Sequence, residues 1–197
     1  MKDLKIAVKT FLFFSVLVGL VYPIFITLVA KIVMPYKANG SLLIKDNKVI
    51  GSVLIGQSFT EDKYFQSRPS FVGYNAQGSG GSNYGPSNKK FIEEVAEKIK
   101  SVRAINGISD SVVPADMVLS SASGLDPHIS VENALIQAKR VAQVRRIPLD
   151  EILRLVNNNT DKDFLGVWGR PGVNVLKLNI TIDELETQYK NRYREPK

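Results

Sequence analysis

Residues 11–30 read "FLFFSVLVGLVYPIFITLVA", twenty consecutive positions without a charged side chain. At the α-helical rise of about 1.5 Å per residue, such a stretch is about 30 Å long and matches the hydrocarbon core of a bilayer. A signal peptide is the alternative, but its apolar region is usually about 7–15 residues long and ends at a small-x-small cleavage site. Leu28 stands where a small residue would be needed for cleavage after Ala30. We therefore expect a retained transmembrane helix, kinked at Pro23.

This helix divides the chain into three parts. We expect a short amino-terminal tail (1–9), a transmembrane helix (10–34) and one soluble domain (35–197). Beyond the anchor, strand-like and helix-like segments mix without internal repeats. The predicted fold class is therefore α+β: one N-terminal transmembrane helix followed by a single mixed α/β soluble domain.

The soluble part begins with a hairpin signal. Residues 41–56 ("SLLIKDNKVIGSVLIG") hold two short apolar runs joined at Asp46 and Asn47, a pair suited to a tight turn. Residues 66–88 are rich in Gly, Ser, Pro and Asn and show no periodicity. Loops of this length inside compact domains are usually functional or disordered.

Three helices are expected next. The first begins near Ser87, the second follows Ser130 as its amino-terminal cap, and Pro148 opens the third at a position that tolerates proline. The first helix carries an apolar stripe that we interpret as core: Phe91, Val95, Ile99 and Val102.

The last elements are predicted as a strand and a closing helix. Residues 173–180 ("VNVLKLNI") alternate apolar and polar side chains, as a strand with one solvated face would. Thr181 followed by Glu184 has the spacing of a capping box, so a helix is expected to start there.

Charge and cysteine content limit the function classes. The chain has no Cys, which excludes disulfides, thiolate metal sites and cysteine nucleophiles. Residues 1–34 hold four Lys and one Asp, so residues 35–197 keep 22 basic and 18 acidic residues. This small excess, without a basic stripe interleaved with aromatics, gives no reason to expect nucleic-acid binding.

One motif in the loop and the single histidine are candidates for chemistry. In "SGGSNYGPSN" (79–88), Gly80 and Gly85 have P-loop spacing, but Pro86 stands where the phosphate-binding Lys belongs. His128 is the only histidine, so no His-rich metal site can form, and no nucleophile elbow lies near it. We expect no catalytic residue, no metal site and no cofactor bound by this chain.

Several segments are more specific when taken in order. They are "YP" (22–23), "GQSF" (56–59), "YFQSRPS" (64–70), "YNA" (74–76), "SGGSNYGPSN" (79–88), "SGLDPHIS" (123–130), "ALIQAKRVA" (134–142) and "VNVLKLN" (173–179). In order and spacing, over nearly the whole chain, they resemble the C subunit of the bacterial Kdp potassium-transporting ATPase.

The resemblance implies a single-pass protein of the bacterial inner membrane in a complex with three partners: a channel-like potassium-translocating subunit, a P-type ATPase subunit and a small hydrophobic subunit. ATP and Mg²⁺ would be used by the complex, with the catalytic aspartate and the ion path in the partners. The family's C subunit is thought to assist assembly and has been proposed as a catalytic chaperone that raises the affinity for ATP. By position, Gln137 and Arg140 and the loop from Ser79 to Asn83 are the parts of this chain that such a nucleotide role would recruit.

The side of the membrane on which the soluble domain lies distinguishes a role that involves ATP from roles outside the cytoplasm. Lys residues lie on both sides of the span, so charge counting does not fix the orientation. We expect the amino terminus in the cytoplasm and the domain outside, where it cannot meet ATP. A membrane-tethered cytoplasmic nucleotide-binding regulator would need the opposite topology, and an exported membrane-anchored enzyme would need catalytic groups that the sequence does not assemble.

For the long loop we predict a surface shaped to contact a partner subunit, because aromatic residues are interleaved with its glycines and prolines. A loop packed only within its own domain, with Phe65 and the other aromatics in the core, is the alternative. The predicted contact or structural motif comprises Tyr64, Ser67, Arg68, Pro69, Ser70, Tyr74, Asn75, Ser79, Gly80, Gly81, Ser82, Asn83, Gly85 and Pro86.

Overall fold

The computed structural model describes residues 1–109, 112–163 and 166–192, with side chains described as far as residue 190. Residues 1–52 and 53–197 form two compact units. The hairpin that we expected within the soluble domain therefore groups with the anchor. The mixture of helices and small sheets in the chain confirms the predicted fold class.

In the first unit, helices α1 (Lys2–Val16) and α2 (Tyr22–Val33) are joined by a π-helical turn, Leu17–Val21. The wider turn immediately precedes Pro23, whose ring and missing N–H disturb the regular α-helical ladder. None of these residues is buried. By length and composition, the continuous helix is able to cross a membrane.

Short helix α3 (Pro35–Ala38) leads from the anchor to a hairpin of β1 (Leu42–Lys45) and β2 (Lys48–Ser52). Asp46 and Asn47 form its turn, both with positive φ, 49° and 61°. Consecutive positive φ angles characterise the tight type I′ turn, in which Asn and Asp are tolerated. The predicted hairpin is confirmed.

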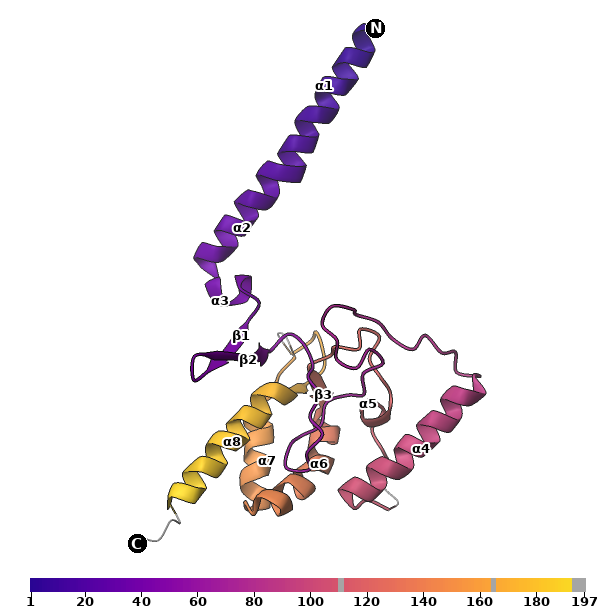
Figure 1. Cartoon of the computed structure of the whole chain (residues 1–197), viewed down its shortest axis with the longest axis vertical. Coiled ribbons are helices and arrows are strands. Elements are labelled where there is room, and N and C mark those ends of the chain that lie inside the picture. Colours follow the sequence, from indigo (N-terminus) through magenta and orange to yellow (C-terminus); the bar gives the residue numbers. More distant parts are fainter. Residues whose placement is uncertain (110–111, 164–165, 193–197) are drawn as a thin grey trace. The chain divides into compact units, whose positions relative to one another are not determined.

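The second unit consists of helices around one small sheet (Figure 1). Strands β3 (His128–Ser130) and β4 (Thr160–Asp161) each pair antiparallel with β5 (Gly172–Asn174), which lies between them. The helices are α4 (Lys89–Asn106), α5 (Ala115–Val118), α6 (Val131–Arg145), α7 (Leu149–Asn158) and α8 (Val175–Arg192).

Local capping signals place three of these helices close to where the sequence predicted them. Ser130 caps α6 by accepting a hydrogen bond from the Asn133 backbone N–H at 3.1 Å, and Pro148 directly precedes α7. Helix α4 is capped by Asn88, one residue after the expected Ser87. Its apolar stripe is only half-buried, and among its residues only Asn106 is buried, so the prediction that the stripe lies in the core was too strong.

The strand predicted over 173–180 was wrong beyond its first two residues. Helix α8 begins at Val175, and the Asn174 side chain accepts a hydrogen bond from the Lys177 backbone N–H at 3.1 Å. Thr181 lies inside the helix and donates to the Lys177 carbonyl, so it does not cap a new helix. The buried positions 175, 178, 179 and 182 have helical spacing, which the alternating Leu residues concealed.

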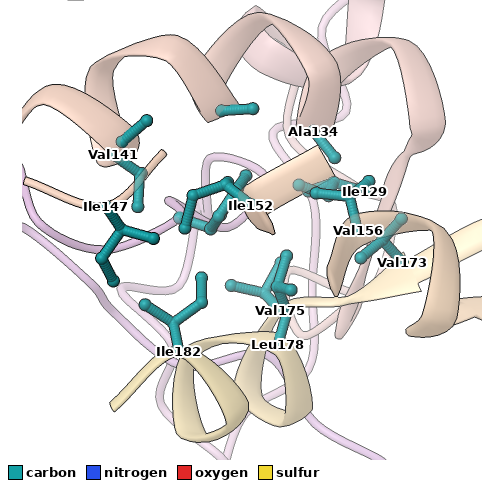
Figure 2. Close-up of a cluster of buried hydrophobic side chains, with 13 residues drawn as sticks. Ile129, Ala134, Val141, Ile147, Ile152, Val156, Val173, Val175, Leu178 and Ile182 are labelled. Carbon is teal, nitrogen blue, oxygen red and sulfur yellow. The ribbon is translucent and has the colours of Figure 1, made fainter. Parts of the chain in front are cut away.

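One hydrophobic core holds the second unit together. Side chains from α6, α7, α8 and the sheet converge in it, as Figure 2 shows. Its members are Phe65, Ile129, Ala134, Ala138, Val141, Ala142, Ile147, Ile152, Val156, Val173, Val175, Leu178 and Ile182. Phe65, which the sequence placed among aromatics facing a partner, has no exposed surface. For this residue the alternative prediction, an intradomain role, is confirmed.

Candidate functional site

Helix α6 and its amino-terminal cap present a row of polar side chains at helical spacing: the cap Ser130, then Asn133, Gln137 and Arg140. Asp116 of α5 starts the row, because its carboxylate accepts hydrogen bonds from the Ser130 backbone N–H at 2.7 Å and from Asn133 Nδ2 at 3.0 Å. Asn133, Gln137 and Arg140 are buried. Because buried polar groups are costly unless hydrogen-bonded, the row must be satisfied within the domain.

The Gln137 amide uses its full hydrogen-bonding capacity inside the domain. Its Oε1 accepts from the Gln66 backbone N–H at 2.7 Å and from Arg140 Nη2 at 2.8 Å. Its Nε2 donates to the Gln66 carbonyl at 3.1 Å and to Asn133 Oδ1 at 2.7 Å. Both donor positions and both acceptor positions are occupied, so this side chain has no free hydrogen-bonding position for a ligand in this conformation.

Asn179 of α8 binds the backbone of Phe65, the residue before Gln66, in the same way. Its Oδ1 accepts from the Phe65 backbone N–H at 2.8 Å, and its Nδ2 donates to the Phe65 carbonyl at 2.9 Å. Two amide side chains, Gln137 and Asn179, therefore hold two consecutive loop residues by both backbone groups. This fixes the Phe65 ring in the core without a strand partner.

Arg140 continues the clamp along the loop. Its Nη1 donates to the carbonyls of Asp62 and of Tyr64, the latter at 3.1 Å, and its Nε donates to Asn106 Oδ1 at 3.1 Å. The Asn106 contact ties α4 to α6. Burial lowers the pKa of the Arg140 guanidinium below its ordinary value, and the Asp62 carboxylate opposes this effect. Arg140 thus connects the loop, α4 and α6.

Arg145, at the end of α6, performs a similar role nearby. Its Nε donates to the Lys63 carbonyl at 2.7 Å, and its guanidinium pairs with Asp183, at 2.8 Å, and with Glu186 of α8. The guanidinium also lies over the Tyr64 ring, 4.9 Å from its centroid. Charge-assisted hydrogen bonds and a stacked aromatic ring compensate the burial of this cation.

Sequence reasoning missed several of these residues, among them Asp116, Asn133 and Asn179. The available signal was a polar side chain at the spacing of a buried helical face, as Asn133 and Gln137 provide on α6. That signal could not name the partner, because the loop groups that Gln137 and Asn179 bind are 71 and 114 positions away along the chain.

The predicted contact loop, here the motif loop (residues 64–86), runs beside residues 119–126, here the serine segment. The Gly80 backbone N–H and the Ser79 hydroxyl both donate to the Ser123 carbonyl, at 2.9 and 3.0 Å. The first glycine of "SGGSN" is therefore engaged by its own domain.

Glycines allow the two backbones to approach closely. Gly124 has a φ of +66°, and a Cβ added there would lie 2.7 Å from the Gly80 carbonyl oxygen. A Cβ at Gly81 would lie 3.1 Å from the Ala122 carbonyl oxygen. Ser70 completes the contact by donating its hydroxyl hydrogen to the Gly124 carbonyl at 2.6 Å. The glycines serve close packing of two chain segments.

We predict that Gly124→Ala destabilises the domain by about 2–4 kcal/mol. A positive φ alone costs Ala about 1 kcal/mol relative to Gly, and the clash with the Gly80 carbonyl adds to that cost. Gly107 is the matched control, because its φ is +63° but an added Cβ would meet nothing within 4 Å. Urea unfolding of both variants checks the difference, and equal losses for the two would contradict a packing role for Gly124.

Arg68 fastens the other end of the motif loop. Its Nη1 lies 3.0 Å from Asp126 Oδ2, and its Nη2 donates to the Ser120 carbonyl at 3.4 Å. The Tyr74 hydroxyl donates to the Arg68 carbonyl at 2.7 Å, and burial raises the pKa of Tyr74 above its ordinary value. Arg68 is thus a clamp between the motif loop and the serine segment.

The other residues of the predicted motif divide by exposure. Ser67 donates to the Gln57 carbonyl at 2.8 Å, and Pro69 and Ser82 line a small cavity of about 150 Å³ against α4. Five members are exposed: Asn75, Ser79, Asn83, Gly85 and Pro86. Ser79 binds the serine segment, and the other four together with the exposed aromatic Phe71 are called the loop rim.

His128 lies on β3 just before the α6 cap, as expected. Its Nε2 is 3.2 Å from Asp161 Oδ2, and its Nδ1 is 4.0 Å from Asp126 Oδ1. An open groove of about 1130 Å³ lies beside it, lined by residues that include Arg68 and Glu132. Over the residues that the structure describes, no group of three or more His, Asp or Glu side chains is arranged to hold a metal ion.

Comparison with known proteins assigns the chain to a family. The family model described as "K+-transporting ATPase, c chain" (KdpC) matches residues 4–184. A potassium-transporting ATPase KdpC subunit of Caldanaerobacter subterraneus is 48% identical over 184 residues, covering 93% of this chain and 95% of that protein. KdpC subunits of Mycobacterium bovis and Polaromonas naphthalenivorans are 46% and 44% identical, covering 93% of this chain and 99% and 95% of those proteins. The anchor helix, the clamped motif loop and the α6–α8 core thus belong to a member of the KdpC family, the c chain of the K⁺-transporting ATPase.

Proposed function

We propose that this chain is a non-catalytic accessory subunit that supports assembly of the potassium-transporting complex, with its amino terminus in the cytoplasm and its domain outside. The partners would be the channel-like subunit, the P-type ATPase subunit and the small hydrophobic subunit that the resemblance implies. ATP hydrolysis and the ion path would lie in those partners.

The observation that carries the proposal is that the candidate nucleotide-binding residues are already hydrogen-bonded within the domain. Gln137 has all its hydrogen-bonding positions filled by the domain, and Arg140 binds loop carbonyls and two side chains. The Gly80 amide, which a phosphate cradle would need, is bonded to Ser123. These contacts favour a rigid loop over a nucleotide site. A rise in the complex's affinity for ATP, the chaperone role, would then be transmitted through subunit contacts.

A rigid loop with an exposed rim is suited to contact another protein. The loop backbone is fixed by the clamps, so the rim loses little conformational entropy on binding. Phe71, 58% exposed, supplies the large aromatic side chain that interface centres favour. We therefore assign the partner-contacting role to the loop rim rather than to the whole predicted motif.

We predict that Phe71→Ala weakens copurification of the partner subunits about 5- to 30-fold, the effect of losing one interface anchor. Leu149→Ala is the control, because Leu149 is also exposed, at 40%, but lies on α7. The measurement is the yield of partner subunits recovered with the tagged full chain. Equal recovery with Phe71→Ala and with the control would contradict the assignment.

Nucleotide binding is checked on the same purified full chain. Titration with an ATP analogue should show no saturation at micromolar concentration. Saturable micromolar binding, together with protease protection of the domain in sealed cells, would favour the cytoplasmic nucleotide-binding regulator. Protease cleavage of the domain from outside would agree with the proposed topology.

A further inference from the structure

The hairpin that follows the anchor presents an apolar face to its surroundings. Ile44 pairs directly with Val49 across the two strands, and Leu42 lies two residues before Ile44 on the same face. We call Leu42, Ile44 and Val49 the hairpin face. Their side chains are 41%, 65% and 59% exposed. Next to them Ile50, the extra residue at the bulge in β2, is 36% exposed.

The unit to which the hairpin belongs has no core that could support it. Within residues 1–52, which are all described, only Ser41 and Ser52 are buried, and both are polar. An isolated two-stranded hairpin is marginally stable in water at best. A surface outside this unit must therefore cover the hairpin face if the hairpin is to persist.

The connection to the anchor keeps the hairpin close to the bilayer. Helix α2 ends at Val33, and only residues 34–41 separate it from β1. Eight residues reach at most about 28 Å when fully extended. Helix α3, which takes up four of them at about 1.5 Å each, shortens that reach to about 20 Å. The headgroup region adjoining the hydrocarbon core is within this distance.

The charges near the hairpin favour an anionic surface. Lys45 and Lys48 face each other directly across the hairpin at its turn. Like charges in directly opposed positions destabilise a hairpin unless another group neutralises them. Residues 31–52 contain four Lys and a single acidic residue, Asp46. Phosphate groups of anionic lipids would relieve the repulsion, and apolar side chains combined with Lys are typical of segments lying in a membrane interface.

We propose that the hairpin Leu42–Ser52 lies in the membrane interface, with the hairpin face against lipid and with Lys45 and Lys48 bound to anionic headgroups. It is a second membrane contact of this chain, formed on the side where the anchor leaves the bilayer. The proposal rests on the anchor spanning the membrane and not on the assembly role, so either of them can fail alone.

The absence of Cys in the chain allows a direct test. Ile44→Cys and Val49→Cys are labelled separately with an environment-sensitive fluorophore in the full chain, reconstituted into vesicles of phosphatidylcholine with or without phosphatidylglycerol. Lipids brominated close to the headgroup serve as quenchers. Leu43→Cys is the matched control, because residue 43 adjoins Ile44 but points to the other face of the strand.

We expect bromolipid to quench the labels at 44 and 49 but not the label at 43. Phosphatidylglycerol should strengthen this quenching, and Lys45→Glu with Lys48→Glu should abolish the strengthening. Each Lys near an anionic surface favours membrane contact about fivefold, so the pair contributes about 25-fold.

Three outcomes would overturn the proposal. Equal quenching at 43 and 44 would show no oriented lipid contact. Shielding of position 44 that arises only with partner subunits present, without bromolipid quenching, would assign the hairpin face to a protein interface. If quenching does not change with phosphatidylglycerol or with the two Lys substitutions, Lys45 and Lys48 do not bind anionic headgroups.

Discussion

Replacing Arg140 by Met will lower the free energy of unfolding of the domain by about 3–5 kcal/mol. The carbonyls of Asp62 and Tyr64 and the Asn106 side-chain oxygen would lose the donor that satisfies them. Leaving a buried acceptor unsatisfied costs about 1–3 kcal/mol for each group, and some of the loop will rehydrate. Met keeps most of the aliphatic volume, so the loss reports the hydrogen bonds.

Urea unfolding of the full chain in detergent, followed by circular dichroism, measures this effect. The neighbouring Lys139 is exposed on the same helix, so Lys139→Met is the control and should change stability by less than about 0.5 kcal/mol. An Arg140→Met variant of normal stability that weakens ATP binding by the complex would contradict the structural role and restore the nucleotide role.

Replacing Phe65 by Ala will destabilise the domain by a similar amount, about 3–5 kcal/mol. Phe65 has no exposed surface and packs in the core, so its truncation leaves a cavity between helices that relax only in part. Removal of the ring also frees the loop residues held by Gln137 and Asn179. We therefore expect the motif loop to become susceptible to proteolysis in this variant.

Phe71→Ala is the internal comparison, because the same substitution six residues later removes a ring that is 58% exposed. Its stability should stay within about 0.5 kcal/mol of the unmodified chain. Equal destabilisation by the two substitutions would place Phe71 in the core and would withdraw it from the loop rim.

The parts of the fold that were predictable depend on local chemistry. Asp46 and Asn47 adopt positive φ readily, so the hairpin turn is encoded in two adjacent residues. Ser130 caps α6 with its own hydroxyl, three residues before the backbone N–H that it binds. The anchor depends on length and hydrophobicity alone. The turn and the cap each depend on residues fewer than five positions apart, and the anchor depends on no specific interaction between residues.

The parts that were missed depend on distant partners. Leu176, Leu178 and Ile180 alternate with polar residues, and this pattern is as compatible with a strand as with a helix over so short a range. Asn179 decides the matter, because it is buried in order to bind Phe65, which lies 114 positions earlier. No local pattern could show that a polar residue of the supposed wet face points inward.

The motif loop shows the same limit. Its composition of Gly, Ser and Pro with aromatics indicated an ordered contact surface. The composition did not show which residues of the loop would bind the serine segment and which would stay exposed. Gly80 and Ser79 are fixed by Ser123, whereas Asn83, Gly85 and Pro86 are exposed. Their separate roles follow only from the position of residues 119–126 in the folded domain.

The clamp between Phe65 and Asn179 also has a consequence for biosynthesis. The loop and α8 are 114 positions apart, and the two ends of the domain are joined again where Asn174 donates to the Val53 carbonyl, 121 positions away. At a translation rate of roughly 5–20 residues per second, α8 follows the loop by roughly 5–25 s. Throughout this interval the nascent chain already carries its apolar anchor, while Phe65 has neither its core nor its amide partner. The domain therefore cannot complete its fold until α8 has been made, long after the apolar helix, and its folding is one of the last events in the synthesis of the chain.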